Sequence, residues 1–218
     1  MKNLKKISPF QYITQDIENG PSHADLAESA CKGGADWIQL RVKNISGDLL
    51  NNLAWEVKNI CSKYGAALII NDHVMLARDI QTHGVHLGSE DMDPVTARKI
   101  LGEEFIIGAT ANTIHDLERL STLPVDYIGI GPFRFTRTKS KLSPVMGLNG
   151  IKTIIGQSEN LSFHKPLIAI GGIRLDDVEE IMNTGVHGVA VSSAINFSGN
   201  RSEMTSQFIK AINRYINV

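Results

Sequence analysis

The sequence lacks an excess of charge of either sign. Its 218 residues carry 22 Lys and Arg against 23 Asp and Glu, a formal net charge of -1. No overall positive field is present to recruit nucleic acid or anionic lipid, so an anionic ligand must be held by local charges. We therefore expect neither a nucleic-acid nor a membrane partner, while assembly into a homo-oligomer stays open.

Long hydrophobic runs are also missing. The basic N-terminus is not followed by the apolar stretch of a signal peptide, and no run approaches membrane-spanning length. Cysteine is scarce as well, since only Cys31 and Cys61 occur, both in segments with helical character. We expect a cytoplasmic protein whose two thiols are reduced and buried, in preference to a disulfide or a metal site.

The chain contains no feature that would divide it into domains. It has no Pro/Ser-rich linker, no low-complexity tract and no break in composition. Barrels of alternating strands and helices fold at this length with an ample core. We expect residues 1–218 to form one domain.

What the sequence does contain is a repeated short apolar run that ends in glycine, hydroxyl or charged residues. The runs are continuous and rich in β-branched residues, as strands covered on both faces are. Their C-terminal ends lie at 39–43, 71–72, 88–91, 108–110, 131–132, 171–172 and 192–193. In a closed parallel barrel these ends meet on one rim, which is where catalytic residues of such barrels lie.

Segments with helical periodicity separate the apolar runs. Ser22 and Asp25 have the spacing of a capping arrangement, and Gly65 stands where a helix would end. We expect helices ending at residue 32 and spanning about 49–64, 93–101, 113–120, 175–183 and 208–216.

Counting 12–14 as the first strand, eight strands alternate with helices, which predicts an α/β fold, a single (β/α)8 TIM barrel. The competing architecture is an open doubly wound sheet, which also places ligands at the C-terminal ends of strands. Its first turn usually carries a glycine fingerprint, which residues 15–20 lack. We therefore favour the closed barrel.

Three polar side chains follow the second apolar run at alternate positions. Residues two apart on an extended strand face the same way, so Gln39, Arg41 and Lys43 would project together toward the barrel mouth. An amide and two cations suit a phosphate or pyrophosphate. The alternative is a solvated strand end whose charges contact nothing.

Carboxylates follow the next two runs, at Asn71-Asp72 and Glu90-Asp91. Two carboxylates, together with oxygens of a phosphorylated substrate, are a common way of holding Mg²⁺. The alternative is that Asp72 and Asp91 cap the helices that begin near His73 and Asp93. Their matched positions after adjacent strands favour the metal.

Two further rim segments have the composition of anion sites. Residues 129–139 combine glycine, hydroxyls and three cations, which suits a loop that closes over an anion, although basic surface loops are also common. Gly171-Gly172 and Ser192-Ser193 follow the last two strands, where barrels often bind phosphate. Two anion sites with Mg²⁺ beside the first suggest that a pyrophosphorylated and a monophosphorylated substrate are joined.

In order and spacing, these segments resemble the thiamine phosphate synthase family, from about residue 12 to residue 195. The resemblance implies a transferase that joins 4-amino-5-hydroxymethyl-2-methylpyrimidine diphosphate to a thiazole monophosphate and releases pyrophosphate, with Mg²⁺ as cofactor. It also implies a dissociative substitution that requires no protein nucleophile, in keeping with the lack of a convincing Cys–His or Ser–His pairing.

The resemblance also implies roles for individual residues. Gln39, Arg41, Lys43, Asn71 and Lys139 would hold the pyrimidine diphosphate, and Arg41, Lys43 and Lys139 would stabilise the departing charge. Asp72 and Asp91 would bind Mg²⁺. Thr110 would lie near the pyrimidine, Thr136 and Thr138 would contact the thiazole substrate, and its phosphate would bind at Gly172, Ser192 and Ser193.

The chain departs from the family pattern at four positions: Val42, Ser89, Asn112 and Ser192. A histidine is common at position 112, where related thiazole tautomerases carry a catalytic His, so Asn112 counts against that relative. His86, within an apolar run, is expected to be a packed residue. Two alternatives stay open: a tautomerase on this scaffold, which would need no Mg²⁺, and a non-catalytic barrel that binds a phosphorylated ligand.

Overall fold

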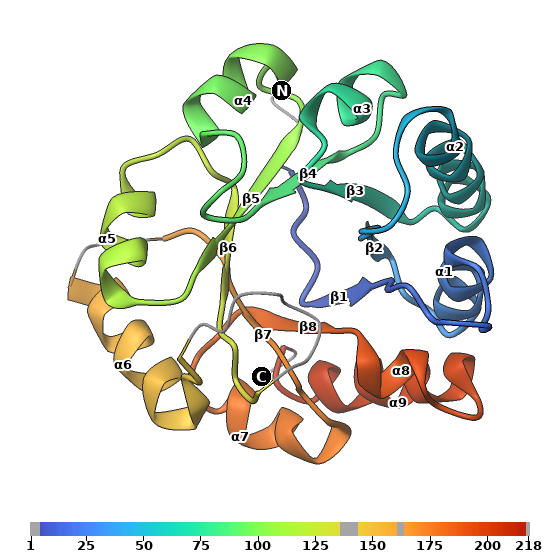
Figure 1. The fold of residues 1–218 in the computed structure, drawn as a ribbon. Coiled ribbons are helices and arrows are strands. Elements are labelled where there is room, and N and C mark those ends of the chain that lie inside the picture. Colours follow the sequence, from blue (N-terminus) through green and yellow to red (C-terminus); the bar gives the residue numbers. More distant parts are fainter. Residues whose placement is uncertain (1–4, 136–143, 161–163, 217–218) are drawn as a thin grey trace.

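The computed structural model describes residues 5–135, 144–160 and 164–216. Its eight parallel strands pair in chain order, and the last strand pairs with the first, so the sheet closes into a barrel (Figure 1). This confirms the (β/α)8 barrel and rules out the open sheet. The strands are β1 (Phe10–Ile13), β2 (Trp37–Leu40), β3 (Ala67–Asn71), β4 (Gly84–Leu87), β5 (Ile106–Ala111), β6 (Tyr127–Ile130), β7 (Leu167–Ile170) and β8 (Gly188–Val191).

Helices surround the barrel on its outer side (Figure 1). They are α1 (His23–Lys32), α2 (Gly47–Tyr64), α3 (Val74–Asp79), α4 (Pro94–Leu101), α5 (Ile114–Ser121), α6 (Gly147–Asn160), the 3₁₀ helix η1 (Leu175–Asp177), α7 (Val178–Met182), α8 (Ser193–Asn196) and α9 (Arg201–Asn213). Within the described ranges, none of the helices is long and apolar enough to cross a bilayer.

The helix ends follow the expected chemistry. Ser22 and Asp25 form a reciprocal capping box at the start of α1. Gly65 ends α2 in the left-handed conformation, with φ of 68°. The side chain of Asp93 accepts hydrogen bonds from the backbone of Val95 and Thr96 at the start of α4.

Several expected boundaries are wrong. The helix expected over 175–183 is divided into η1 and α7, and the last helix begins at Arg201 instead of near 208. Helix α6 was not anticipated, because Gly147, Gly150 and Gly156 are poor helix formers and obscure its periodicity. Strand β2 ends at Leu40, so Arg41 and Lys43 lie beyond the strand on which they were expected, whereas Thr110, expected after its apolar run, lies within β5.

Side chains on each strand alternate between the barrel interior and the layer between barrel and helices. On β2, Trp37 belongs to the interior cluster, while Ile38 and Leu40 pack toward the helices. Inside, Trp37 meets Tyr127 edge to face, with ring centroids 4.8 Å apart. Gly108 leaves room for the Tyr127 ring, because a Cβ there would lie 2.1 Å from its Cζ. Cys31 and Cys61 are both buried and free, as expected.

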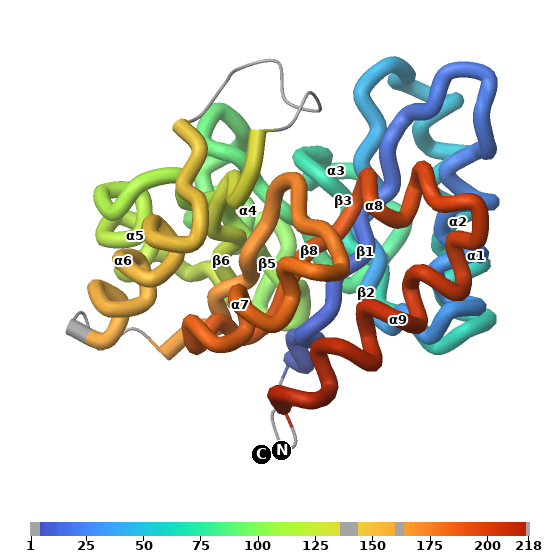
Figure 2. The backbone as a smooth tube through the Cα atoms, turned by 90° about the horizontal axis from the view of Figure 1, so that it is seen from below, coloured from blue at the N-terminus to red at the C-terminus, as the bar shows by residue number. Residues whose placement is uncertain are grey.

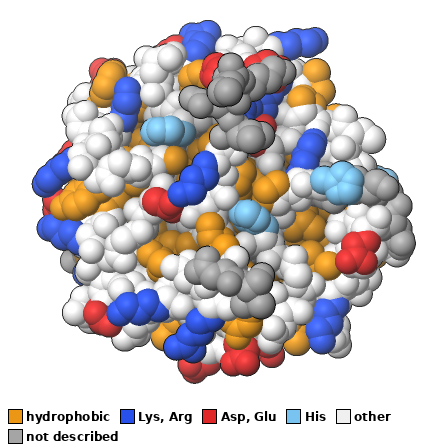
Figure 3. All heavy atoms as spheres, turned by 180° about the vertical axis from the view of Figure 1, so that it is seen from behind, with side chains coloured by type: hydrophobic (Ala, Val, Ile, Leu, Met, Phe, Trp, Pro, Cys, Tyr) orange, Lys and Arg blue, Asp and Glu red, His pale blue; other side chains and the backbone are white. Residues whose placement is uncertain are grey.

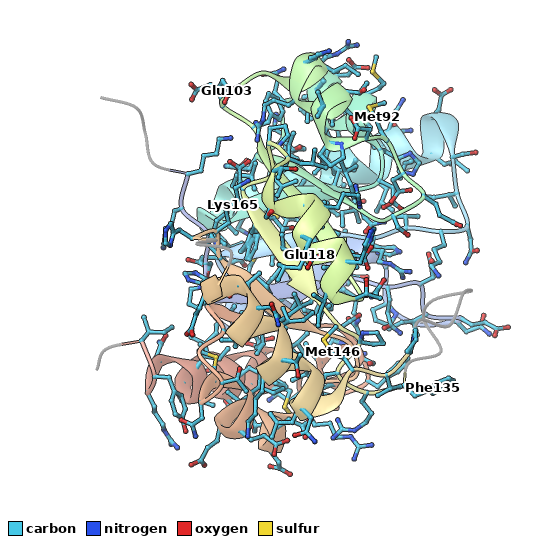
Figure 4. The ribbon with its side chains drawn as sticks, turned by 90° about the vertical axis from the view of Figure 1, so that its left-hand side faces the viewer. Met92, Glu103, Glu118, Phe135, Met146 and Lys165 are labelled. Atoms are coloured by element: carbon cyan, nitrogen blue, oxygen red, sulfur yellow. The ribbon has the colours of Figure 1, made fainter. Side chains whose placement is uncertain are left out.

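The two ends of the barrel differ. The loops that follow the strands lie at one end, and the chain enters β1 and leaves α9 at the other (Figure 2). Phe135 and Met92 lie toward the first end, whereas Glu103 and Lys165 lie toward the second (Figure 4). On the face where the strands begin, positive and negative side chains are interspersed with apolar surface (Figure 3).

Candidate functional site

A cavity of about 700 Å³ opens among the loops that follow the strands. Below it a smaller cavity of about 80 Å³ reaches the ends of β7 and β8. Both are lined by Arg41 from the loop after β2 and by Gly172 and Ser193 from the loops after β7 and β8. The larger cavity is lined by Gln15, Asp16, Arg41, Lys43, Asn44, Arg134, Phe135, Gly172, Ile173, Arg174, Ser193, Ala194 and Phe197. Residues that the sequence assigned to two separate anion sites therefore share one space.

Arg41 and Lys43 supply cations to one side of this cavity. Partial burial lowers the pKa of the Arg41 guanidinium, while Asp72 and Asp16 act in the opposite direction. Burial and then the charge of Arg41 lower the pKa of Lys43. Burial disfavours the charged form of both side chains, and an anion bound beside them would offset this. Val42 packs against the outer core.

Part of the barrel interior is polar. Nε2 of Gln39 donates to Oδ1 of Asn71 at 2.8 Å. Oε1 of Gln39 is buried and has no partner, which leaves an acceptor for a bound ligand. His86 lies between the hydroxyls of Tyr127 and Thr110, each 2.9 Å from a ring nitrogen, so it is the packed, hydrogen-bonded residue that was expected.

The capping interpretation of Asp72 and Asp91 is wrong. The N-cap positions of α3 and α4 belong to His73 and Asp93. Asp91 instead accepts a hydrogen bond from the backbone of Gly88 at 2.6 Å. Asp72 has a left-handed backbone, with φ of 67°.

Asp72 and Asp91 lie close enough to interact electrostatically. Partial desolvation, followed by the neighbouring Asp91 carboxyl, raises the pKa of Asp72 to about 7, although its side chain keeps contact with solvent. A divalent cation would neutralise this pair, and carboxylate oxygens are ligands that Mg²⁺ accepts. In the described part of the chain no group of three His, Cys, Asp or Glu could hold a metal, so further ligands would have to be of another kind, such as oxygens of the substrate and water.

The loop after β7 has the backbone expected of a close-approach site. Gly171 and Gly172 have φ of 100° and 68°, which disfavours other residues. Arg134, which the sequence did not single out, donates to the carbonyl of Gly172 at 2.6 Å and to both carboxylate oxygens of Asp177 at 2.7 and 2.9 Å. Asp177 also accepts from the backbone of Arg174 at 2.7 Å. Arg134 and Asp177 therefore fix the shape of this loop.

Ser192 and Ser193, which follow β8, make different contacts. Ser193 begins α8 and lines both cavities. Ser192 donates to Oε1 of Gln15 at 3.0 Å and accepts from Nδ2 of Asn196 at 3.0 Å. The hydroxyl of Ser192 therefore links two loops of the rim, which gives this departure from the family pattern a structural role.

Three expected site residues, Thr136, Thr138 and Lys139, lie outside the described residues. Asn112 donates its side-chain N–H to the carbonyl of Gly131 and its backbone N–H to Asp116. Position 112 is thus occupied by a hydrogen-bonding side chain in place of an acid–base group.

Comparison with known proteins identifies the family. Residues 10–195 match the family model described as thiamine monophosphate synthase. A thiamine-phosphate synthase of Phocaeicola vulgatus is 47% identical over 190 residues, which are 87% of this chain and 91% of that protein. One of Flavobacterium psychrophilum is 46% identical over 93% of this chain and 98% of that protein. The thiamine phosphate pyrophosphorylase of Pyrococcus furiosus superposes with a TM-score of 0.84 at 28% identity, covering 95% of this chain and 97% of that one. The chain belongs to the thiamine monophosphate synthase family.

Proposed function

We propose that this protein is a thiamine phosphate synthase, which joins 4-amino-5-hydroxymethyl-2-methylpyrimidine diphosphate to a thiazole monophosphate and releases pyrophosphate. One observation carries the proposal beyond family membership. A single cavity of about 700 Å³ is lined both by Arg41 and Lys43 and by Gly172 and Ser193. A reaction between two anionic substrates requires such a shared space, because their reacting atoms must meet.

The diphosphate substrate is assigned to residues at the ends of β2, β3 and β4. Arg41 and Lys43 would bind its phosphates, together with Lys139. Gln39 and Asn71 lie below, and the unpartnered Oε1 of Gln39 supports an N–H donor of the pyrimidine as its ligand. Thr110 lies in the same part of the barrel interior, where its hydroxyl is hydrogen-bonded to His86.

The thiazole phosphate is assigned to the loops after β7 and β8, at Gly172, Ser192 and Ser193, and Thr136 and Thr138 would contact the same substrate. Gly172 would allow the phosphate to approach its backbone, and its conformation is held by Arg134. Ser193 adds a hydroxyl at the cavity wall. Ser192 would contribute through its backbone, because its hydroxyl already bonds Gln15.

The reaction is a substitution at carbon in which protein groups stabilise charge. The C–O bond of the pyrimidine methylene breaks, pyrophosphate leaves with the bonding electrons, and the thiazole nitrogen forms the new C–N bond. Arg41, Lys43 and Lys139 stabilise the negative charge that develops on the leaving group. The cavity holds the thiazole nitrogen against the reacting carbon.

Asp72 and Asp91 are the residues that would hold Mg²⁺, which neutralises charge on a departing pyrophosphate when bound. The fit rests on their proximity, because partial desolvation, followed by the neighbouring Asp91 carboxyl, raises the pKa of Asp72 to about 7. Asp72 lies near Arg41, whose charge lowers the pKa of Asp72.

The test is to incubate purified protein with both substrates and Mg²⁺ and to measure thiamine phosphate and pyrophosphate. The synthase forms both in equal amounts, whereas a tautomerase or a binding protein forms neither. Asp91→Asn should remove most of the Mg²⁺-dependent activity. Asp93→Asn is the matched control, because asparagine is as good an N-cap as aspartate and this variant should keep full activity. Equal activity of the two variants would contradict the metal assignment.

A further inference from the structure

The turn after β1 contains no residue that the sequence assigned to the site. In the structure three consecutive residues of this turn, Thr14, Gln15 and Asp16, contact both halves of the proposed site. Gln15 and Asp16 line the shared cavity, and Thr14 is fully buried beneath them. The turn therefore lies between the residues assigned to the two substrates.

Two of these side chains hold the backbone that carries the diphosphate-binding cations. Strand β2 ends at Leu40, so the backbone beyond it has left the regular ladder. Oγ1 of Thr14 accepts the backbone N–H of Arg41 at 3.1 Å. Oδ2 of Asp16 accepts the backbone N–H of Lys43 at 3.2 Å. The positions of both cations thus depend on acceptors supplied by the neighbouring turn.

A buried histidine holds these two acceptors in place. His23, the first residue of α1, is 8% exposed. Its Nδ1 lies 2.7 Å from Oγ1 of Thr14, and its Nε2 lies 3.1 Å from Oδ1 of Asp16. Each contact uses a different ring nitrogen, so the imidazole joins the two acceptors and restricts their orientation.

The middle residue of the turn reaches the other half of the site. Oε1 of Gln15 accepts the hydroxyl of Ser192 at 3.0 Å. That hydroxyl also accepts from Asn196, which is fully buried and bonded to the hydroxyl of Tyr12 and to the carbonyl of Ile13. The start of the loop after β8 is therefore tied to β1.

We propose that Thr14, Gln15 and Asp16, supported by His23, are positioning residues that align the two anion sites with each other. Thr14 and Asp16 place the pyrophosphate-binding cations, and Gln15 places the phosphate-binding loop. The proposal rests on the proposed function for the identity of the two ligands. It goes beyond that function because it assigns the relative placement of the substrates to a turn that makes none of the proposed primary contacts.

The test compares the binding of two ligands to two variants by calorimetry. Thr14→Val keeps the shape of the side chain but removes the acceptor for Arg41. It should weaken the binding of inorganic pyrophosphate with Mg²⁺ by roughly 5- to 30-fold, the usual effect of losing one buried hydrogen bond. Its affinity for thiazole phosphate should stay within about twofold of the wild type, as expected for a separate site. Gln15→Met should weaken the binding of thiazole phosphate and leave the affinity for pyrophosphate nearly unchanged.

Two controls separate positioning from general stability. Thr205→Val removes a hydroxyl from an equally buried threonine, which donates to the carbonyl of Arg201 in α9, and should leave both affinities unchanged. Thr14→Ser restores the acceptor and should recover pyrophosphate binding. If Thr14→Val does not fold, His23→Gln should show the same selective loss of pyrophosphate binding.

Equal losses for both ligands in each variant, or no loss in either, would overturn the positioning role. The outcome is distinct from that of the proposed function. If wild-type protein binds both ligands but forms no thiamine phosphate, the synthase proposal fails, and the measured selectivities still decide the positioning role. If wild-type protein binds neither ligand, both proposals fail.

Discussion

Replacing Asp72 by Asn should stabilise the metal-free protein at alkaline pH while abolishing Mg²⁺-dependent activity. Desolvation and the Asp91 carboxyl raise the pKa of Asp72 from 3.8 to about 7. The folded state therefore holds a proton that the unfolded chain releases near pH 4, and stability falls as the pH rises from about 4 to 7. An asparagine carries no such charge, and it tolerates the left-handed backbone at this position as well as aspartate does.

The magnitude follows from the size of the pKa change. A fully buried carboxyl with this change would lose roughly 4 kcal/mol of stability above pH 7. Because Asp72 keeps contact with solvent, we expect only about 1–2 kcal/mol. For a chain of this length the gain corresponds to roughly 2–8 °C in Tm.

The assay is a thermal melt of wild-type and Asp72→Asn protein at pH 5 and pH 8, with EDTA and with Mg²⁺. In EDTA the variant should melt at the higher temperature, by a margin that widens from pH 5 to pH 8. Mg²⁺ at pH 8 should stabilise the wild type and narrow the gap. A variant that is less stable than the wild type at pH 8 in EDTA would refute the carboxylate-pair reasoning.

Three further substitutions test the loop after β7, the packing of the barrel interior and the cation assigned to the leaving group. Gly172→Val places a β-branched residue at φ of 68°, with its Cβ 2.9 Å from Cβ of Arg134. This variant should raise the KM for thiazole phosphate by on the order of 10-fold, whereas its affinity for pyrophosphate, measured by calorimetry, should change little. Gly108→Ala would press Cβ into the buried Tyr127 ring and should cost about 3 kcal/mol in the free energy of unfolding, measured by urea denaturation. Lys139→Ala should lower kcat by on the order of 100-fold in steady-state assays if this cation acts on the leaving group, and an unchanged kcat would remove it from the mechanism.

The barrel could be predicted because each strand carries the same signal, an apolar run that ends in polar residues. This signal misplaces the end of a strand when polar residues of the strand lie inside the barrel. Gln39 and Thr110 are such cases, since Gln39 bonds Asn71 and Thr110 bonds His86 within the interior. A single sequence does not reveal these pairs, because their members are far apart along the chain.

The residues of the candidate site could be predicted from the rim segments, but their supports could not. Arg134 is one of the three cations of a rim segment that was expected to bind an anion. In the structure it is paired with Asp177 and holds the loop at Gly172. His23 is the first residue of a helix, a position that indicates no special role in the sequence. In the structure its two ring nitrogens contact Thr14 and Asp16. Such roles depend on which loops the closed barrel brings together.

The most direct test of the central claim is a crystal structure with thiamine phosphate, pyrophosphate and Mg²⁺ bound. We expect pyrophosphate against Arg41 and Lys43, with the metal at Asp72, and the phosphate of thiamine phosphate in the same cavity at Gly172 and Ser193. Products bound away from this rim, or both anions on one side of the cavity, would contradict this claim.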